Sequence, residues 1–131
     1  MAADYILRPI GVVTSTLKIR EEAPNQENEG APSAWIILDE EVAEGLEGIE
    51  EGHPILVLTW FHQSKRDILK LHPQWNKNNP LTGVFATRSP DRPNPVGLHQ
   101  VKVLEKKGNR IRVNHLEAID GTPVIDIKPV I

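Results

Sequence analysis

The chain has 131 residues, of which 39% are hydrophobic and 25% charged, and its formal net charge is −3. These values are typical of a soluble globular protein, so we predict a single domain over residues 1–131, located in the cytoplasm. The absence of cysteine excludes disulfides, thiolate metal sites and a cysteine nucleophile. The N-terminal residues lack the basic and apolar regions of a signal peptide, and no apolar run reaches membrane-spanning length.

Alternation of apolar and polar residues with a period of two predicts the strands in the first half of the chain. Strands are indicated over Ile10–Thr16, Ala34–Asp39 and Ile55–Phe61, the last of them long and largely buried. Between the second and third strands, Asp39–Ile49 has an N-cap aspartate, acidic residues in its first turn and apolar residues at helical spacing, which predicts a short helix. A second short helix is predicted over Lys65–Leu71.

The second half of the chain is predicted to contain a hairpin and a terminal strand. Val101 and Val103 alternate with polar residues, and the same alternation resumes after the turn residues EKKGN. The stretch Pro123–Ile131 alternates again, but its two prolines favour an edge strand or a short one. Short strands, frequent turns and little helix predict a mainly β fold, with one antiparallel sheet curled into a small barrel or packed as a sandwich.

Acidic and basic residues are segregated along the chain. The stretch Glu21–Glu51 contains eleven acidic residues and no lysine or arginine, whereas His62–Arg112 contains eleven lysines and arginines against three acids. Each run is compatible with a solvated face, and Glu21–Pro32 is predicted to be a flexible loop. The alternative is that the basic half contacts an anionic partner such as nucleic acid, because local charge decides such binding.

Several common catalytic and nucleotide-binding motifs are missing. The sequence has no Walker A motif and no G-x-S-x-G motif, and the glycines of Gly45–Gly52 lie in the acidic helical stretch instead of following a strand. A Rossmann site or a serine-nucleophile elbow is therefore not predicted. The five histidines are scattered without the spacing of metal ligands, so no metal site is predicted either.

Polar residues gather where the predicted strands end. His62 and Gln63 follow the third strand, Thr87–Pro95 reads TRSPDRPNP, and Asp120–Pro123 is a turn before the last strand. Prolines restrict their own φ and the residue before them, so the TRSPDRPNP loop has little backbone freedom to lose when it binds a ligand. Each cluster alone has an ordinary structural explanation, but together they predict the rim of one binding site.

These stretches give the chain a resemblance to a known family. IGVV, GLEGIEEGHPILVLTWFHQS, TGVFATRSPDRPNPVGL and DGTPVIDIKP cover almost the whole chain, and they resemble the TrmO family of tRNA methyltransferases, which includes VirR/YaeB-like proteins. The resemblance implies a non-Rossmann methyltransferase on a small antiparallel β-barrel that forms a homodimer. It also implies S-adenosylmethionine as cofactor, no metal, no membrane partner, and a tRNA substrate methylated in the anticodon loop at N6 of threonylcarbamoyladenosine 37.

Carried over residue by residue, the resemblance implies a cofactor site formed by Pro24, Asn25, Gln26, His62, Gln63, Arg88, Leu98, Asp120, Gly121, Thr122 and Pro123. The sequence departs from the family at Asn25, where arginine is usual. Longer members of the family also carry a C-terminal domain that helps to bind tRNA, and we expect this protein to lack that extension after DIKPVI.

Methyl transfer from a sulfonium needs alignment more than a reactive side chain. We expect Arg88 to bind an anionic group, either the carboxylate of the cofactor or that of the threonylcarbamoyl group, and Arg92 to lie nearer the RNA phosphate. Asp120 and Asp126 are the candidate acceptors for the N6 proton. The alternative function is a non-catalytic module that binds RNA or a nucleotide and holds S-adenosylmethionine as a ligand.

Overall fold

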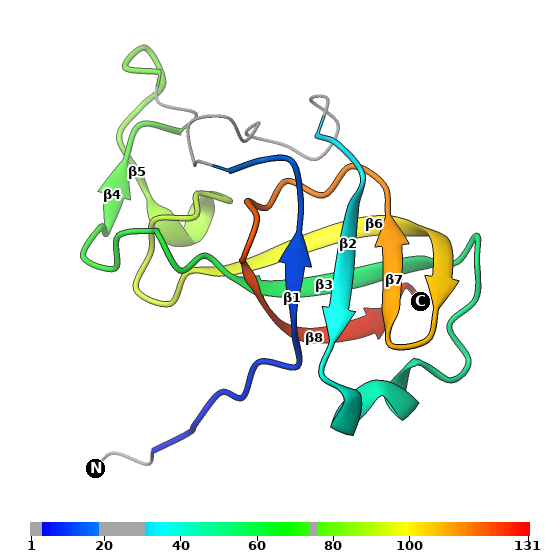
Figure 1. Ribbon diagram of the computed structural model, residues 1–131. Helices are drawn as coiled ribbons and strands as arrows, with labels where there is room; N and C mark the ends of the chain where they lie inside the picture. Colours follow the sequence, from blue (N-terminus) through cyan, green and yellow to red (C-terminus); the bar gives the residue numbers. More distant parts are fainter. Residues whose placement is uncertain (1–3, 19–30, 74–75) are drawn as a thin grey trace.

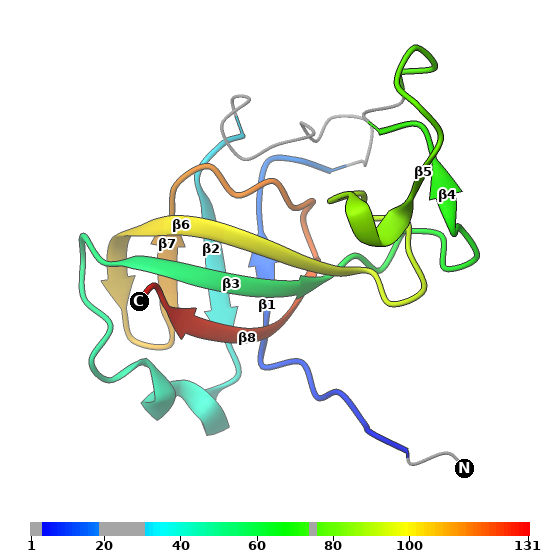
Figure 2. The same ribbon diagram turned by 180° about the vertical axis from the view of Figure 1, so that it is seen from behind.

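The computed structural model describes residues 4–18, 31–73 and 76–131 (Figure 1). Six strands of these residues form a closed barrel in the order β1-β2-β7-β6-β3-β8, and every neighbouring pair is antiparallel (Figures 1 and 2). The mainly β class is confirmed, and of the two predicted arrangements the sheet adopts the barrel. The bounds of the strands are β1 Gly11–Thr14, β2 Ala34–Leu38, β3 Pro54–Trp60, β6 Val96–Lys107, β7 Arg110–Val113 and β8 Pro123–Pro129.

The core of the barrel is apolar because alternate residues of each strand point inward. On β3, Ile55, Val57 and Thr59 are buried, whereas Leu56 and Leu58 between them lie on the outer face and are partly exposed. Most of the inward residues are branched aliphatic side chains, which suit strands because they pack well on a pleated surface. The period-two alternation in the sequence therefore corresponds to the inside and the outside of the barrel.

The β6–β7 hairpin has the predicted turn. β6 has 12 residues and pairs with β3 along its first part and with β7 along its second. Next to this change of partner, the pairing with β7 has a bulge between Val103 and Glu105. A bulge bends the strand that carries it. The turn itself is at Gly108, whose φ is 57°, and Asn109, whose side-chain amide donates a hydrogen bond of 2.7 Å to the Leu38 carbonyl.

The terminal strand differs from its prediction. β8 has seven residues and pairs with both β1 and β3, so it is neither short nor an edge strand. Its two prolines are tolerated because they occupy the two ends of the strand. The pairing with β3 shifts between Leu58 and Thr59: Thr59 pairs with Val124, and Leu58 pairs with Asp126. Since Leu58 faces outward, this shift places Asp126 on the outer face of the barrel.

The helix predicted before the third strand is present as a shorter 3-10 helix, η2, over Glu40–Leu46. Val42 and Leu46 pack against the barrel core, as their spacing predicted. The ammonium of Lys106 donates to the carbonyls of Leu46 (3.1 Å) and Ile49 (2.9 Å), where a cation stabilises the carbonyl end of a helix. In the part of the chain that the structure describes, no helix has the length and apolarity needed to cross a membrane.

Between β3 and β6 the chain leaves the barrel (Figure 1). This excursion contains a two-stranded antiparallel sheet of β4, Lys70–Leu71, and β5, Thr82–Gly83, followed by the 3-10 helix η4, Val84–Ala86. The amide of Val84 donates to the carbonyl of Leu69 (2.9 Å), which connects η4 to the residues before β4.

The helix predicted over Lys65–Leu71 is wrong. The amide of Lys65 donates to Oδ1 of Asp91 (2.9 Å), and its carbonyl accepts from the amide of Arg92 (3.1 Å). Both backbone groups of Lys65 therefore bind the proline-rich loop instead of a helical turn. A helix of only seven residues has little intrinsic stability in water, so these tertiary contacts outweigh it.

Candidate functional site

One end of the barrel gathers the strand ends that the sequence singled out. β3 ends beside the start of β6, because Trp60 pairs with Val96, and beside the start of β8, because Thr59 pairs with Val124. The end of β1 reaches the same place, since Val13 exchanges backbone hydrogen bonds with Gly121 and Thr122 just before β8. The arrangement of the strands is seen in Figures 1 and 2. We call the four segments at this end the rim: Thr14–Lys18, Phe61–Ser64, Thr87–Pro95 and Glu117–Pro123.

The loop Thr87–Pro95 is held from within by one of its own arginines. Arg92 donates from Nη1 to the carbonyls of Thr87 (3.0 Å) and Ser89 (2.9 Å), and from Nη2 to the carbonyl of Val84 (2.9 Å). The planar guanidinium suits this task because its N–H groups have fixed directions. Arg92 was expected nearer to an RNA phosphate, but these contacts direct its guanidinium into the loop, where it fixes the backbone.

The loop is also attached to the segment that follows β3. Asp91 is 1% exposed, and its carboxylate accepts the hydrogen bond from the Lys65 amide. At the other end of the loop, the amide of Phe61 donates to the carbonyl of Pro95 (2.8 Å). Prolines and hydrogen bonds together therefore hold this loop and the residues after β3 as one unit.

Arg88 and Leu98, both predicted to lie in the cofactor site, are in contact. Nη2 of Arg88 donates to the carbonyl of Leu98 (2.8 Å), and both side chains are exposed at the surface. A guanidinium carries five N–H donors, and this hydrogen bond uses one of them. The bond thus fixes the position of Arg88 while leaving donors for an anionic ligand.

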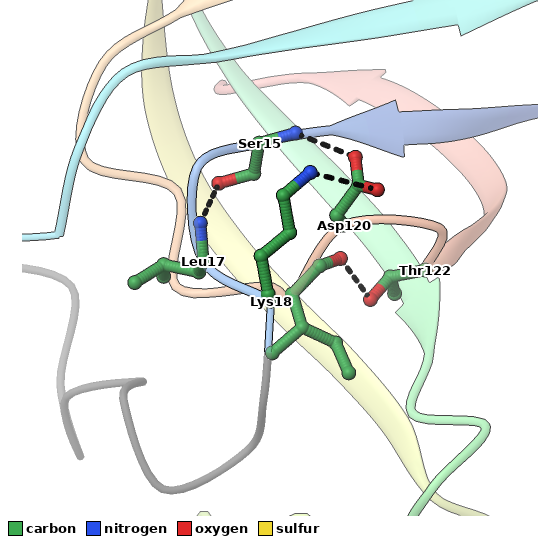
Figure 3. A network of polar contacts seen from close by, with 6 residues as sticks. Ser15, Leu17, Lys18, Asp120 and Thr122 are labelled. Carbon is green, nitrogen blue, oxygen red and sulfur yellow. Dashed lines mark hydrogen bonds and ion pairs between the residues drawn. The ribbon is translucent and has the colours of Figure 1, made fainter.

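The predicted turn before β8 is present and is anchored to β1 (Figure 3). The amide and the hydroxyl of Thr122 both donate to the carbonyl of Ile119, at 3.2 Å and 2.6 Å. Gly121 has a φ of 86°, a backbone conformation that glycine adopts without steric cost because it has no Cβ. The amide of Gly121 donates to the carbonyl of Val13 (2.8 Å), and the amide of Val13 donates to the carbonyl of Thr122 (2.9 Å).

Asp120 connects this turn to the segment after β1. The amide of Ser15 donates to Oδ1 (3.0 Å), and the ammonium of Lys18 lies 3.2 Å from Oδ2 (Figure 3). The Ser15 amide and, after it, the Lys18 ammonium hold the pKa of Asp120 below its ordinary value. A carboxylate stabilised as an anion in this way is a weak base.

Five predicted cofactor residues remain: two lie on the rim and three lie outside the described part of the chain. His62 and Gln63 are exposed on the rim, in a turn closed by a hydrogen bond from the Ser64 amide to the Phe61 carbonyl (3.0 Å). Three predicted residues lie outside the described part of the chain: Pro24, Asn25 and Gln26.

Asp126 does not share the environment of Asp120. It lies on the outer face of the barrel, opposite Leu58, and its Oδ2 is 3.6 Å from the ammonium of Lys128. Its Oδ1 accepts from the amide of Ile127 (2.9 Å). The barrel thus separates the two aspartates that the sequence offered as alternatives, since Asp120 belongs to the rim and Asp126 to the outer wall.

Directly beneath the rim lies a buried polar group that was not predicted from the sequence as a site residue. His99 is fully buried, its Nε2 lies 2.8 Å from the hydroxyl of Thr59, and its Nδ1 lies 4.0 Å from Oε1 of Glu117. Burial and, after it, the charge of Arg88 lower the pKa of His99 from 6.5 to about 4. The period-two alternation of the sequence could have predicted this burial, because His99 occupies an inward position of β6 between Gly97 and Val101.

The rim is equipped to bind and orient a ligand. It presents a guanidinium, an imidazole, a side-chain amide and several backbone groups, all on short segments held by the barrel. Among the described residues there is no group of three or more histidine, aspartate or glutamate side chains arranged to hold a metal ion.

Comparison with known proteins identifies what the chain is similar to. Residues 12–131 match the family described as the tRNA-methyltransferase O N-terminal domain. The chain is 46% identical over 123 residues to an S-adenosyl-L-methionine-binding protein of Archaeoglobus fulgidus, covering 94% of this chain and 87% of that protein. It is 45% identical over 128 residues to a probable S-adenosyl-L-methionine-binding protein of Methanocaldococcus jannaschii, covering 95% of this chain and 90% of that protein.

Solved structures show the same fold. A crystal structure of TrmO from Pseudomonas aeruginosa superposes with a TM-score of 0.78 at 30% sequence identity, over 100% of this chain and 56% of that one. A second crystal structure of TrmO gives 0.78 at 32% identity, over 98% of this chain and 58% of the other. The chain therefore spans little more than half the length of these two solved proteins.

Proposed function

The chain belongs to the family of the tRNA-methyltransferase O N-terminal domain, and from that premise we propose that it is an S-adenosylmethionine-dependent methyltransferase acting on tRNA. We further propose that the methylated atom is N6 of threonylcarbamoyladenosine 37 in the anticodon loop. The observation that carries the proposal is the rim, in which the loop of Arg88 and the Asp120–Pro123 turn lie at one end of the barrel, together with the hydrogen bond from Arg88 to the Leu98 carbonyl.

The residues of the rim fit the chemistry of S-adenosylmethionine. Its carboxylate matches the remaining donors of Arg88, since charge-assisted bonds to a guanidinium are strong. Its base and ribose present donors and acceptors that match His62, Gln63 and the backbone groups of the Asp120–Pro123 turn. The cofactor supplies the methyl group as a sulfonium, which reacts by in-line displacement and needs no metal.

The contribution of the protein is alignment. Holding two reactants in the attacking geometry supplies on the order of 7–11 kcal/mol of the barrier. Arg92 and Asp91 fix the backbone of the loop that carries Arg88. The loop therefore loses little conformational entropy when a ligand binds. We propose that Arg88 binds either the carboxylate of the cofactor or that of the threonylcarbamoyl group. In both cases Arg88 would hold one of the two reactants in position.

The charge distribution supports an RNA substrate. The segment His62–Arg112 contains eleven lysines and arginines against three acids, and it includes the rim loop and the excursion next to it. Adenosine 37 lies in a single-stranded loop, so its base is accessible without opening a duplex. We therefore propose that this basic segment contacts the phosphates of the anticodon loop, and that a homodimer completes the site.

A non-catalytic module is the second candidate, and one finding favours it. The relatives from A. fulgidus and M. jannaschii carry names that state S-adenosylmethionine binding and no reaction. A module that holds the cofactor as a signal would use the same rim and the same basic segment. It explains less well why the loop is fixed so rigidly, because signalling does not require near-attack geometry.

Two measurements on the purified protein separate these functions. Calorimetric titration with S-adenosylmethionine tests binding, and mass spectrometry of nucleosides from tRNA incubated with protein and cofactor tests methyl transfer. Binding with transfer to N6 supports the enzyme, whereas binding without transfer supports the module. If neither is observed, the proposed function is wrong.

Arg88→Ala provides the sharper test of the site. Arg88 is exposed, so the variant is expected to fold while losing a charge-assisted contact, which weakens binding or transfer about 10- to 100-fold. Arg8→Ala is the matched control, because Arg8 is an exposed arginine before β1 and lies outside the basic segment His62–Arg112. Undiminished N6-methyl product with Arg88→Ala contradicts the role assigned to Arg88.

A further inference from the structure

Phe85 is an aromatic side chain that the fold leaves uncovered. It is 79% exposed, whereas the other phenylalanine of the chain, Phe61, packs edge-on against His99. Phe85 lies in the middle of η4, directly after Val84, which is 1% exposed. The contact of η4 with the rest of the molecule is thus made by Val84, and the packing of the chain does not account for the ring of Phe85.

The backbone that carries Phe85 is held in place. The amide of Val84 donates to the carbonyl of Leu69 (2.9 Å). The carbonyl of Val84 accepts hydrogen bonds from the amide (3.0 Å) and the hydroxyl (2.9 Å) of Thr87, and from Nη2 of Arg92 (2.9 Å). The backbone of η4 therefore loses little conformational entropy when a ligand packs against the ring.

Phe85 also lies close to the rim. Figure 1 shows η4 between the β4–β5 sheet and the barrel. Arg88 follows Phe85 by three residues, so their Cα atoms lie within about 11 Å of each other. The guanidinium of Arg88 donates to the Leu98 carbonyl (2.8 Å). A nucleotide that neighbours a base bound at the rim is therefore within reach of Phe85.

The segment that carries Phe85 is positively charged. Residues 62–95 contain six lysines and arginines against two acids. One of the acids, Asp91, is 1% exposed and accepts a hydrogen bond from the Lys65 amide. Lys70, Lys77 and Arg88 are exposed. Exposed cations beside an aromatic ring are typical of proteins that bind single-stranded nucleic acid, because the cations contact phosphates and the ring stacks on a base.

We propose that Phe85 stacks on an RNA base that flanks the adenosine methylated at the rim. This inference rests on the proposed function and adds a contact to the RNA beside the reacting base. The face of the ring suits any base, so the contact positions the RNA without selecting its sequence. A second copy of the chain is a less suitable occupant, since a two-fold interface would bring this basic segment against itself and like charges repel.

The first test measures the affinity for an anticodon stem-loop RNA by fluorescence anisotropy. Alanine substitution of an aromatic that stacks on a base weakens binding by about 5- to 150-fold, which we expect for Phe85→Ala. Phe85→Trp should keep the affinity, whereas Phe85→Leu should lose it, because leucine is apolar but has no aromatic face. Wild-type affinity in Phe85→Ala or in Phe85→Leu overturns the proposal.

Tyr5→Ala is the matched control for this test. Tyr5 is also an exposed aromatic, at 91%, but it precedes β1 and lies outside the basic segment. We expect wild-type RNA affinity in Tyr5→Ala, and unchanged urea midpoints in all the variants because both rings are exposed. An equal loss of affinity in Tyr5→Ala and Phe85→Ala overturns the stacking contact.

The second test locates the stacked base. Stem-loop RNAs carry an abasic nucleotide on one side or the other of the target adenosine. One of the two substitutions should weaken binding to the wild-type protein and have no further effect on binding to Phe85→Ala, as expected for two partners in one contact. Additive losses for both substitutions overturn the proposal.

Light scattering separates RNA from a second copy as the occupant. We expect the same mass for Phe85→Ala as for the wild-type protein. A lower mass shows that a second copy covers the ring, and it overturns the proposal.

Failure of this inference differs from failure of the proposed function. A wild-type protein that shows the stacking effect but transfers no methyl group, by mass spectrometry of nucleosides, refutes the proposed function and supports the contact. A wild-type protein that methylates N6 without any effect of Phe85→Ala on RNA binding refutes the contact alone. A wild-type protein that does not bind the RNA overturns the contact as well.

Discussion

Two inward-facing residues of β6, Gly97 and His99, pack around the buried Thr59 hydroxyl at one end of a mainly apolar barrel. The imidazole of His99 bonds the Thr59 hydroxyl and packs edge-on against Phe61. Gly97 leaves the space that both partners occupy, because a Cβ there would meet the hydroxyl of Thr59 and lie 2.5 Å from Cζ of Phe61. The two positions therefore act as one unit beneath the rim.

Stability should depend on pH through His99. The folded protein holds this imidazole at a pKa of about 4 against an ordinary value of 6.5, so between these values the unfolded chain binds a proton that the folded chain does not. The free energy of unfolding should therefore fall by about 3 kcal/mol as the pH drops from 6.5 to 4. Urea denaturation across this range measures the slope, and His99→Gln should remove most of it. A slope of equal size in the variant would assign the effect to other groups.

A methyl group at position 97 should be costly. Gly97→Ala forces Thr59 and Phe61 to move, and overpacking of this kind destabilises a protein by about 1–3 kcal/mol. Gly45→Ala is the matched control, since a Cβ at Gly45 in η2 meets nothing within 4 Å. Urea midpoints at an unchanged m-value provide the comparison. Equal midpoints for the two variants would show that the barrel end relaxes freely.

At the scale of elements, the TRSPDRPNP loop combines two sources of rigidity. The prolines restrict the backbone locally, as the sequence predicts. Arg92 then bonds three backbone carbonyls, and Asp91 attaches the loop to Lys65. Arg88 is left with donors for a ligand because its loop neighbours carry the structural contacts.

Loss of the Arg92 guanidinium should loosen this loop. Arg92→Lys keeps the charge but not the planar set of donors, so it should behave like Arg92→Ala. We expect faster amide hydrogen exchange in residues 84–95 and weaker S-adenosylmethionine binding in both variants, because ordering a free residue costs about 1–2 kcal/mol. Arg110→Ala on the barrel wall is the control. Unchanged exchange in Arg92→Ala would mean that the prolines alone hold the loop.

At the scale of the whole molecule, the solved relatives extend well beyond the length of this chain. The chain covers 56% of the TrmO chain from P. aeruginosa while matching it over its own full length. Among the described residues of one small barrel, the rim has four short segments as walls for both a cofactor and a nucleotide. A second copy of the chain is the simplest source of further walls, in agreement with the proposed homodimer.

Light scattering coupled to size exclusion tests the dimer. We expect a mass of twice the 14.7 kDa of the chain at the concentrations used for activity. Methyl transfer per chain should also fall on dilution below the dissociation constant, because a monomer would lack part of the site. A fully active monomer would rule out the idea that the dimer completes the site.

Local patterns predicted most of the fold. Period-two alternation located the barrel strands, and the turns at Gly108 and Gly121 followed from glycines beside turn-forming residues. Two expectations failed for one reason, since the helix over Lys65–Leu71 and the edge position of β8 were each changed by contacts with distant segments.

The sequence by itself determined the strands, the turns and the stiffness of the loop, because these depend on propensities and sterics over a few neighbouring residues. Only the tertiary structure decided that Glu117 lies beside His99, that Arg88 donates to the Leu98 carbonyl, and that Asp126 lies on the outer face of the barrel. Closure of the barrel depends on pairing between strands far apart in the chain, and a bulge of one residue reverses the face to which a side chain points.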